Sequence, residues 1–301
     1  MSILVVGSVA LDSVETPYGS VTEVLGGSAT YFSTAASLYS QVNLVAVVGS
    51  DFPAEHIHFL EGRGVDTRGL EVAPGKTFRW AGRYDYIENI THTLDTQLNV
   101  FSTFHPTLPP GYEKSDVVFL ANIDPDIQYE VLCQVSDARL KMVDTMNFWI
   151  KGKRESLCRT IGLVDIVTLD ESEARLLAQH YNVIASARSI LELGPKVVIV
   201  KQGGYGSIMV SEDGFFTAPA YPVIDVHDPT GAGDSFAGGF LGYLEHAGEV
   251  TPQTMRQAIF HGTAVASFTV SGFSIDGLRH LTRPDVAARY EELIQLTHFC
   301  Q

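Results

Sequence analysis

Cysteine is scarce in this 301-residue chain, which has only Cys133, Cys158 and Cys300 and no Cys-x-x-Cys pair. An odd number at wide spacing predicts reduced, unreactive thiols rather than a disulfide framework. Long apolar runs are also missing, because none reaches the roughly 18 residues that a membrane-spanning helix needs. Residues 1–7 lack the basic start of a signal peptide and instead predict a first β-strand. Together these absences predict a soluble, cytoplasmic protein.

Basic residues are few as well: 20 Lys and Arg stand against 35 Asp and Glu, and the formal net charge is −15. This charge repels nucleic acid and anionic membranes, so we expect neither as a partner. Such a chain can bind a phosphorylated ligand only through local devices such as helix N-termini, Mg²⁺ or single cations. The 45% of hydrophobic residues, with only 18% charged, exclude a disordered chain or a coiled coil.

Short apolar runs rich in β-branched residues recur along the chain, at 3–6, 44–48, 117–120, 140–143, 166–169 and 197–200. They are continuous rather than alternating, which is typical of strands covered on both faces. Helix-length stretches separate them, for example 29–39, 127–135, 172–180 and 184–193. This order predicts an α/β fold of three layers, α/β/α, with a mainly parallel central sheet, in one domain over residues 1–301.

Residues 76–103 break this rhythm, because aromatic and polar residues alternate there, as at Phe78, Trp80 and Tyr84. Period two predicts antiparallel strands with one solvated face. Together with residues 12–24 they predict a small β-sheet that projects as a lid. The aromatic side chains either stack on a ligand or cover the lid's own core or a dimer seam, and we favour the second alternative. Arg79 and Arg83 would hold a phosphorylated ligand if they faced the cleft, but solvated charges are the commoner case.

The strongest local signal is Asp-Pro-Thr-Gly-Ala-Gly-Asp at residues 228–234, which a strand-like run precedes and a helical run follows. Small residues let backbone N–H groups approach an anion, and the helix start adds its positive dipole end. Asp234 is electrostatically out of place beside an anion unless it accepts a proton from an attacking hydroxyl group. The alternative is that Asp234 merely caps the helix.

This string resembles the C-terminal motif of the ribokinase-like (PfkB) carbohydrate and nucleoside kinases. Other positions agree in the same order along the chain: Gly-Ser-Val-Ala-Leu-Asp at 7–12, the di-glycine at 26–27, Gly-Ser-Asp at 49–51 and Lys-Gln-Gly-Gly-Tyr-Gly at 201–206. The resemblance implies a ribokinase-like fold and an ATP-dependent kinase that transfers the γ-phosphoryl group to a hydroxyl group. A primary alcohol of a sugar is the preferred acceptor, a nucleoside is the alternative, and a non-catalytic relative that only binds these ligands is less favoured.

The resemblance also implies roles for the residues of the turn. Asp234 would deprotonate the acceptor hydroxyl group, and the amides of Gly231, Ala232 and Gly233 would hold the moving phosphoryl group. Phosphoryl transfer needs mainly positioning and charge neutralisation, which such a turn supplies. A dinucleotide oxidoreductase is disfavoured, because Gly-x-Gly-x-x-Gly does not follow residue 6.

The acceptor is expected at a second group of residues. By the resemblance, Asp12, Gly26 and Gly27 would bind its hydroxyl groups. Tyr31 stands where many sugar kinases of the family have an asparagine, which weakens an assignment to ribose. Asn147 follows a predicted strand end, where ligands of α/β sheets usually bind, and we expect it in the same pocket.

Nucleotide and metal contacts complete the predicted site. The predicted nucleotide-binding residues are Lys201, Gly203, Gly206, Thr230 and His261. The acids at 170 and 173 stand where the family usually has Asn-x-x-Glu, so Asp170 and Glu173 would hold Mg²⁺ through water; a plain helix start is the alternative. Asp228 resembles a position that binds a monovalent cation such as K⁺ in some members. Lids of this family often pair between subunits, so a homodimer is expected.

Overall fold

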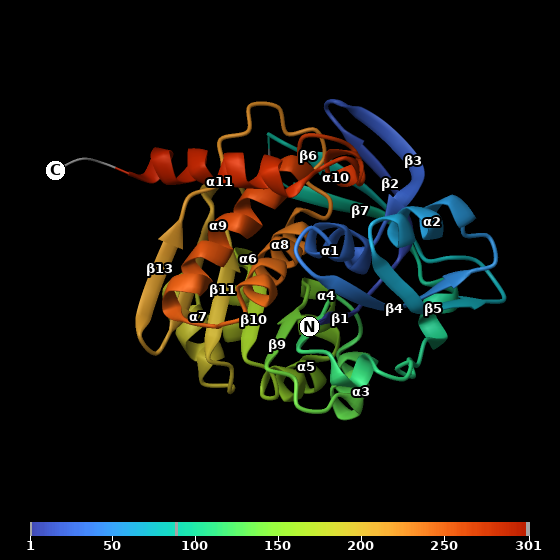
Figure 1. Cartoon of the computed structure of the whole chain (residues 1–301), viewed down its shortest axis with the longest axis horizontal. Coiled ribbons are helices and arrows are strands. Elements are labelled where there is room, and N and C mark those ends of the chain that lie inside the picture. Colours follow the sequence, from blue (N-terminus) through green and yellow to red (C-terminus); the bar gives the residue numbers. More distant parts are fainter. Residues whose placement is uncertain (1, 88–89, 299–301) are drawn as a thin grey trace.

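The computed structural model describes residues 2–87 and 90–298, and its centre is a nine-stranded sheet (Figure 1). Its strand order is β13-β12-β11-β10-β9-β8-β1-β4-β5. Neighbours from β11 to β5 run parallel, whereas β12 and β13 continue the sheet as antiparallel strands. The strands are β1 (Ser2–Val6), β4 (Gln41–Gly49), β5 (Val65–Ala73), β8 (Val117–Leu120), β9 (Leu140–Asp144), β10 (Ile166–Asp170), β11 (Val197–Lys201), β12 (Ser207–Ser211) and β13 (Gly214–Ala218).

Helices cover both faces of this sheet. One core joins alternate strand residues such as Ile3 and Val5 to α1 (Ser28–Ala36), α2 (Ala54–Gly62), α8 (Ala232–Ala247), α9 (Pro252–Thr269), α10 (Asp276–Arg279) and α11 (Arg283–Thr297). The opposite core joins Leu4 and Val6 to α3 (Pro125–Gln134), α4 (Asn147–Gly152), α5 (Arg154–Ile161), α6 (Glu171–Ala178) and α7 (Val183–Leu191). The three-layer fold with a mainly parallel sheet is therefore confirmed.

The six predicted strand runs all lie in strands of the central sheet, and the four named helical stretches all overlap helices. The burial pattern explains the success: residues 3–6 and 117–120 are fully buried, as strands covered on both faces must be. The expectation did not name β5, β12 or β13. β5 lies at the sheet edge and carries Asp66, Arg68 and Glu71, so it lacks the apolar run.

A separate four-stranded sheet, here called the lid, has the order β3-β2-β6-β7 and lies at the upper right of Figure 1. Its strands are β2 (Ala10–Thr16), β3 (Gly19–Gly26), β6 (Arg79–Asp85) and β7 (Ile90–Gln97). Two antiparallel hairpins meet where β2 and β6 pair in parallel. The strands β6 and β7 lie within 76–103, and β2 and β3 extend beyond 12–24. The treatment of the lid as an insertion into one domain stays a prediction.

The lid aromatics are divided between two environments. Phe78 stacks on Phe101 with ring centroids 5.4 Å apart, at the base of the lid. Trp80 and Tyr84 meet edge to face at 6.5 Å. The favoured expectation, that these rings cover the lid's own core, therefore describes Trp80. Phe78 instead packs against the core of the central sheet, and Tyr84 also reaches the site described below.

Two of the remaining expectations concern the cysteines and the membrane. Cys133 and Cys158 are free thiols, and Cys300 lies outside the described residues. In the part of the chain that the structure describes, no helix is both long enough and apolar enough to span a bilayer.

The contact between α1 and the central sheet gives a test of the core. Phe32 is fully buried and stacks on Phe119 of β8 with ring centroids 4.3 Å apart. Phe32→Ala should lower the free energy of unfolding by about 3–5 kcal/mol, because it leaves a cavity. Urea unfolding followed by circular dichroism measures the change. Leu94→Ala on the exposed face of β7 is the control, and equal losses in both variants would contradict this packing.

Candidate active site

The predicted anion-binding turn lies at the start of α8. Gly231 precedes the helix with φ = 74°, a left-handed conformation that suits glycine. A Cβ atom there would lie 2.3 Å from ring atoms of Tyr31, so the position must also lack a side chain. The N–H of Ala232 donates to the Pro229 carbonyl at 3.2 Å, which closes the turn. Because the first N–H groups of a helix have no partner within it, this end can receive an anion.

One cation lies against this turn. Lys201, the last residue of β11, places Nζ 2.8 Å from Oδ2 of Asp144 at the end of β9. A Cβ atom on Gly233 would lie 2.9 Å from the same Nζ, so this glycine lets the ammonium group approach the helix start. Asp144 was not among the predicted site residues. The signal that could have found it is a carboxylate directly after a buried parallel strand.

Asp234 lies in the first turn of α8, beside this ion pair. Burial and, next, the charge of Asp144 raise the pKa of its carboxyl group and the Lys201 ammonium group lowers it, so that the pKa is about 7. A carboxyl group with a pKa near 7 can take up and release a proton at neutral pH, which suits a general base.

Asp12 lies on β2 and is only 5% exposed. Its Oδ2 accepts a hydrogen bond from the Gly27 N–H at 3.2 Å. A Cβ atom on Gly26 would lie 1.9 Å from that oxygen, and Gly27 has φ = 93°, so both glycines are needed. Burial raises the pKa of Asp12 to about 7; the Gly27 hydrogen bond lowers it, and the charges of Asp228 and Asp234 raise it.

Two phenol groups lie among these carboxylates. Tyr31 is 1% exposed, and burial, followed by the charges of Asp12, Asp228 and Asp234, raises its pKa well above 10. Tyr84 of the lid accepts a hydrogen bond from the Thr230 hydroxyl group at 3.0 Å. The structure thus brings the predicted Asp12, Tyr31, Thr230 and Asp234 into one cluster.

A cavity of about 550 Å³ extends from the turn. The predicted Lys201, Gly203, Gly206 and Gly233 line it, together with apolar residues that include Val226, Phe236 and Ala266. Gly206 has φ = 100°, and a Cβ atom there would lie 2.0 Å from the Ala218 carbonyl oxygen. Lid residues 84–86 and 90–91 close one side of the cavity.

His261 is not among the described residues that line this cavity. It is stacked between Tyr243 and Tyr290, with centroid distances of 4.0 and 4.5 Å, and its Nδ1 lies 3.1 Å from the Tyr39 hydroxyl group. Burial, with the charges of Arg283 and His246, lowers its pKa to about 4. The geometry is that of a neutral histidine in a helix interface.

Asp170 and Glu173 form a capping box at the start of α6. Asp170 Oδ1 accepts from the Glu173 N–H at 2.8 Å, and Glu173 Oε2 accepts from the Asp170 N–H at 2.7 Å. Burial raises the pKa of Glu173 to about 8; Lys201 lowers it, and Asp170 and Asp144 raise it. The acids therefore do begin a helix, as the alternative held, yet Glu173 is electrostatically coupled to the site.

A magnesium ion held through water fits this donor set. Across residues 2–87 and 90–298, no group of three or more histidine, cysteine or acidic side chains forms a direct metal cage. Mg²⁺ in proteins usually keeps several waters and binds one or two carboxylates together with the phosphates of the substrate. Glu173 and Asp170 can supply the carboxylates.

Asp228 connects the turn to the segment before α10. Its Oδ1 accepts from the Thr230 N–H at 2.9 Å and its Oδ2 from the Ser274 N–H at 3.1 Å. Burial raises its pKa despite these bonds. Both carboxylate oxygens thus fix backbone, and the monovalent-cation role stays a prediction.

Amide and indole groups follow the neighbouring strands β8 and β9. The Trp149 Nε1–H donates to Oδ1 of Asn122 at 3.1 Å. Asn147, the first residue of α4, has its Nδ2 3.4 Å from the Ser172 hydroxyl oxygen. Because β8 lies next to β1 and β9 lies next to β8 in the parallel part of the sheet, these groups share the edge that carries the rest of the site.

The lid is closed over the turn. Thr16 Oγ1 and the Tyr86 hydroxyl group both donate to the His227 carbonyl, at 2.8 and 3.1 Å. The Tyr18 ring stacks on the His227 ring with centroids 4.7 Å apart. These contacts connect the end of β2 and the residues that follow β2 and β6 to His227, which precedes the anion-binding turn.

The pKa of Asp234 can be tested without a ligand. In the free protein its carboxyl resonance should titrate near pH 7 in a ¹³C NMR experiment, far above the ordinary 3.8. Lys201→Met should move this titration to still higher pH, because it removes the charge that favours the carboxylate. Lys196→Met, at a surface ion pair just before the same strand, should leave it unchanged. A titration near pH 4 in the unsubstituted protein would contradict this electrostatic environment.

Comparison with known proteins gives a consistent picture. Residues 2–276 match the model of the pfkB family carbohydrate kinases. The chain is 30% identical over 248 residues to a cytidine kinase of Thermococcus kodakarensis, which covers 80% of this chain and 87% of that protein. It is 27% identical over 263 residues to a nucleoside kinase of Methanothermobacter thermautotrophicus, covering 81% and 78%.

Solved structures share the fold. The nucleoside kinase of Methanocaldococcus jannaschii superposes with a TM-score of 0.77 at 20% identity, over 97% of this chain and 98% of that one. The nucleoside kinase of Burkholderia thailandensis in complex with inosine superposes with a TM-score of 0.78 at 18% identity, over 97% and 99%. With the family match over most of its length, the chain belongs to the PfkB family of carbohydrate and nucleoside kinases, phosphotransferases whose acceptor is an alcohol group.

Proposed function

We propose that the chain transfers the γ-phosphoryl group of ATP to the primary hydroxyl group of a nucleoside, with Asp234 as the base. The observation that carries this proposal is the position of the Asp234 carboxyl group. It has a pKa of about 7, lies in the first turn of α8 and shares an electrostatic field with Lys201 and Asp12. A free sugar, the acceptor that the sequence favours, is the second candidate.

The residues divide the reaction among them. Asp12, whose carboxylate the Gly27 N–H orients, would bind the acceptor, and Asp234 would take the proton from the attacking hydroxyl group. The oxygen then forms a bond to the γ-phosphorus while the bond to the β-phosphate oxygen breaks, so ADP leaves and the proton stays on Asp234. The amides of Gly231 and Gly233 would stabilise the transferring group, and Lys201 adds a positive charge beside them. The predicted third donor, the Ala232 N–H, bonds to the Pro229 carbonyl in this structure and would have to leave it to join them.

The proposal also includes sites for the nucleotide and the metal. The cavity lined by Lys201, Gly203 and Gly206 is the proposed ATP site, and Thr230 connects it to the lid. Mg²⁺, held through water by Glu173 and Asp170, would neutralise phosphate charge when bound. His261 would act on the nucleotide only through the packing of α9, and K⁺ at Asp228 remains part of the proposal.

The lid would separate the reaction from water. Tyr84 bonds to Thr230, and Tyr86 to the His227 carbonyl, so the lid contacts the turn that would hold the phosphoryl group. Exclusion of water strengthens each electrostatic interaction inside the site and limits ATP hydrolysis. The exposed Leu94 on β7 supports pairing of two copies through the lid, which light scattering would test.

Two observations favour a nucleoside over a free sugar. The similarity to a cytidine kinase extends over most of both chains. In addition, Asn122, Asn147 and Trp149 offer amide and indole groups at the acceptor edge of the sheet, and such groups can bind the polar edge and the face of a base.

Asp234→Asn tests the base directly. The variant keeps the shape of the side chain but cannot accept the proton, so kcat should fall at least about a hundredfold while ATP binding persists. Asp213→Asn, in the exposed turn between β12 and β13, is the matched control and should keep full activity. Isothermal calorimetry with ATP and a coupled ADP assay measure the two properties, and retained turnover would remove Asp234 from the mechanism.

A panel of acceptors tests the substrate class. Cytidine, other ribonucleosides, ribose and several hexoses are supplied with ATP and Mg²⁺, and products are identified by mass spectrometry. We expect kcat/KM for at least one nucleoside to exceed that for every free sugar by about tenfold or more. The reason is that the nucleobase of the substrate adds contacts to residues after β8 and β9. Preference for a free sugar would exclude the nucleoside proposal and leave the kinase mechanism intact.

A further inference from the structure

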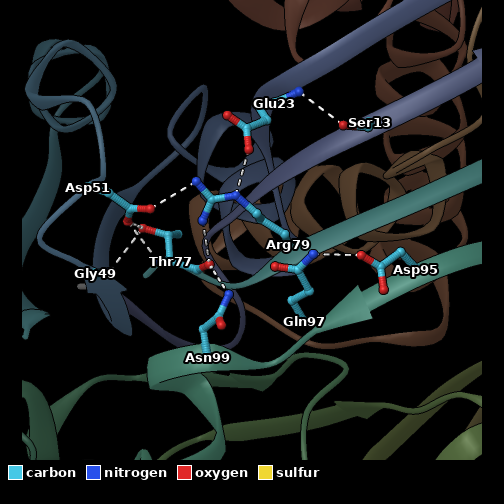
Figure 2. A network of polar contacts seen from close by, with 9 residues as sticks. All are labelled: Ser13, Glu23, Gly49, Asp51, Thr77, Arg79, Asp95, Gln97 and Asn99. Atoms are coloured by element: carbon cyan, nitrogen blue, oxygen red, sulfur yellow. Dashed lines mark hydrogen bonds and ion pairs between the residues drawn. The ribbon is translucent and has the colours of Figure 1, made fainter. Parts of the chain in front are cut away.

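A polar network joins the base of the lid to the central sheet (Figure 2). It lies where the chain leaves β5 of the central sheet and enters β6 of the lid. Thr77, which is fully buried, is its inner member. Its hydroxyl group accepts from the Gly49 N–H at 3.0 Å, and its carbonyl accepts from the Asn99 side chain at 2.9 Å. The network therefore connects the end of β4 with the segment that enters the β6–β7 hairpin, at Thr77, and with the segment that leaves it, at Asn99.

Asp51, shortly after β4, binds this crossing from the side of the central sheet. Its Oδ1 accepts from both the backbone N–H and the hydroxyl group of Thr77, each at 2.7 Å. Partial burial opposes its charge, but the hydrogen bonds from Thr77 and the charge of Arg79 hold its pKa below the ordinary value. The Gly-x-Asp motif of residues 49–51 thus anchors the lid, a role that the sequence analysis did not assign.

Arg79, the first residue of β6, lies at the centre of Figure 2 between two carboxylates. Its Nη2 donates to Asp51 Oδ2 at 2.9 Å, its Nε to Glu23 Oε1 at 2.7 Å, and its Nη1 to the Thr77 carbonyl at 3.0 Å. Its side chain is 18% exposed. All three branches of the guanidinium group are therefore engaged, so it does not offer a free charge to a phosphorylated ligand in this arrangement.

Glu23 is the link from Arg79 to the acceptor site. It is in the left-handed region with φ = 49°, which is uncommon for a residue with a side chain. It lies opposite an irregularity between Asp12 and Val14, where the pairing of β2 and β3 shifts register. The Glu23 N–H donates to the Ser13 hydroxyl group at 3.1 Å. A bulge re-aims the side chains beside it, and here the neighbouring side chain is Asp12.

The backbone pairing of β2 with β6 also fixes Asp12 relative to Arg79. They pair in parallel with Leu11 opposite Arg79 and Asp12 opposite Trp80, and the Leu11 N–H donates to the Phe78 carbonyl at 3.0 Å. Arg79 thus holds Asp12 from two directions, through the bulge on β3 and through the strand that β2 pairs with.

We propose that Arg79 is a positioning residue for Asp12: by bridging Asp51 after β4 and Glu23 in the bulge, it sets the place of the acceptor-binding carboxylate relative to the central sheet. The proposal rests on the function proposed above, in which Asp12 binds the acceptor. Partly exposed ion pairs add little to stability, so the purpose of the arrangement is geometric. Small displacements of a positioned group cost far more in rate than in folding.

Arg79→Met tests this role, because it keeps an unbranched stem about as far as Nε and removes all three donor nitrogens. We expect kcat/KM for the acceptor to fall about tenfold, and acceptor affinity measured by calorimetry without ATP to fall in parallel. The dissociation constant for ATP should stay within about twofold, since Lys201 and the turn at α8 do not contact the network. Arg79→Lys, which keeps one charge, should recover part of the acceptor affinity.

Two further variants separate positioning from stability. Arg83→Met removes an exposed arginine of the same strand, and it should leave both acceptor kinetics and Tm unchanged. Glu23→Gln should weaken acceptor binding by itself. It should add little in the Arg79→Met background, because both substitutions break the same Arg79–Glu23 ion pair. If Arg79→Met unfolds, Glu23→Gln and Arg79→Lys still report the acceptor effect.

The outcomes are distinct. Unchanged acceptor kinetics in Arg79→Met, in a preparation where Asp234→Asn is inactive, would overturn the inference and leave the proposed function standing. A loss of acceptor and ATP affinity in equal proportion to the fall in Tm would show that Arg79 only supports the fold, and would also overturn it. Retained turnover in Asp234→Asn would instead contradict the proposed function.

Discussion

The site depends on one ammonium group that is buried among carboxylates. Lys201 pairs with Asp144 and also lowers the pKa of Asp234 and Glu173, which burial raises. Without this charge, several acids in a small, poorly solvated space would keep their protons. The glycine at 233 is needed for the same reason, since a side chain there would meet the ammonium group. In a chain of net charge −15, a phosphate site has to be built by such a local arrangement.

The lid adds a second constraint, through contacts at both ends of its strand β6. β6 begins at Arg79, which is bound to Asp51 and Glu23, and near its end Tyr84 bonds to Thr230 beside the anion-binding turn. One strand of seven residues therefore spans the distance from the base of the lid to the proposed phosphoryl site. Asp12 lies on the strand paired with it, so the carboxylate proposed to bind the acceptor and the proposed cover over the reaction belong to one small sheet.

Much of this arrangement can be predicted from local sequence, for physical reasons. Residues 117–120 and 197–200 are buried on both faces, so only apolar residues suit them. The edge strand β5 carries charged residues, and its sequence therefore does not predict a buried strand. The turn at 231–233 is recognisable because close approach requires small residues. The pairing of Lys201 with Asp144, the packing of Tyr31 on Gly231 and the stacking of His261 between two tyrosines arise from contacts far apart in sequence. No local pattern encodes them.

The most direct test of the central claim is a crystal structure with ADP, aluminium fluoride and the acceptor that the panel selects. The account predicts that the fluoride group lies against the first turn of α8, with Lys201 beside it. It also predicts that the acceptor oxygen lies within hydrogen-bond distance of Asp234 and that Asp12 holds the acceptor from the other side. Aluminium fluoride bound away from α8, or an acceptor oxygen beyond hydrogen-bond distance of Asp234, would contradict the account.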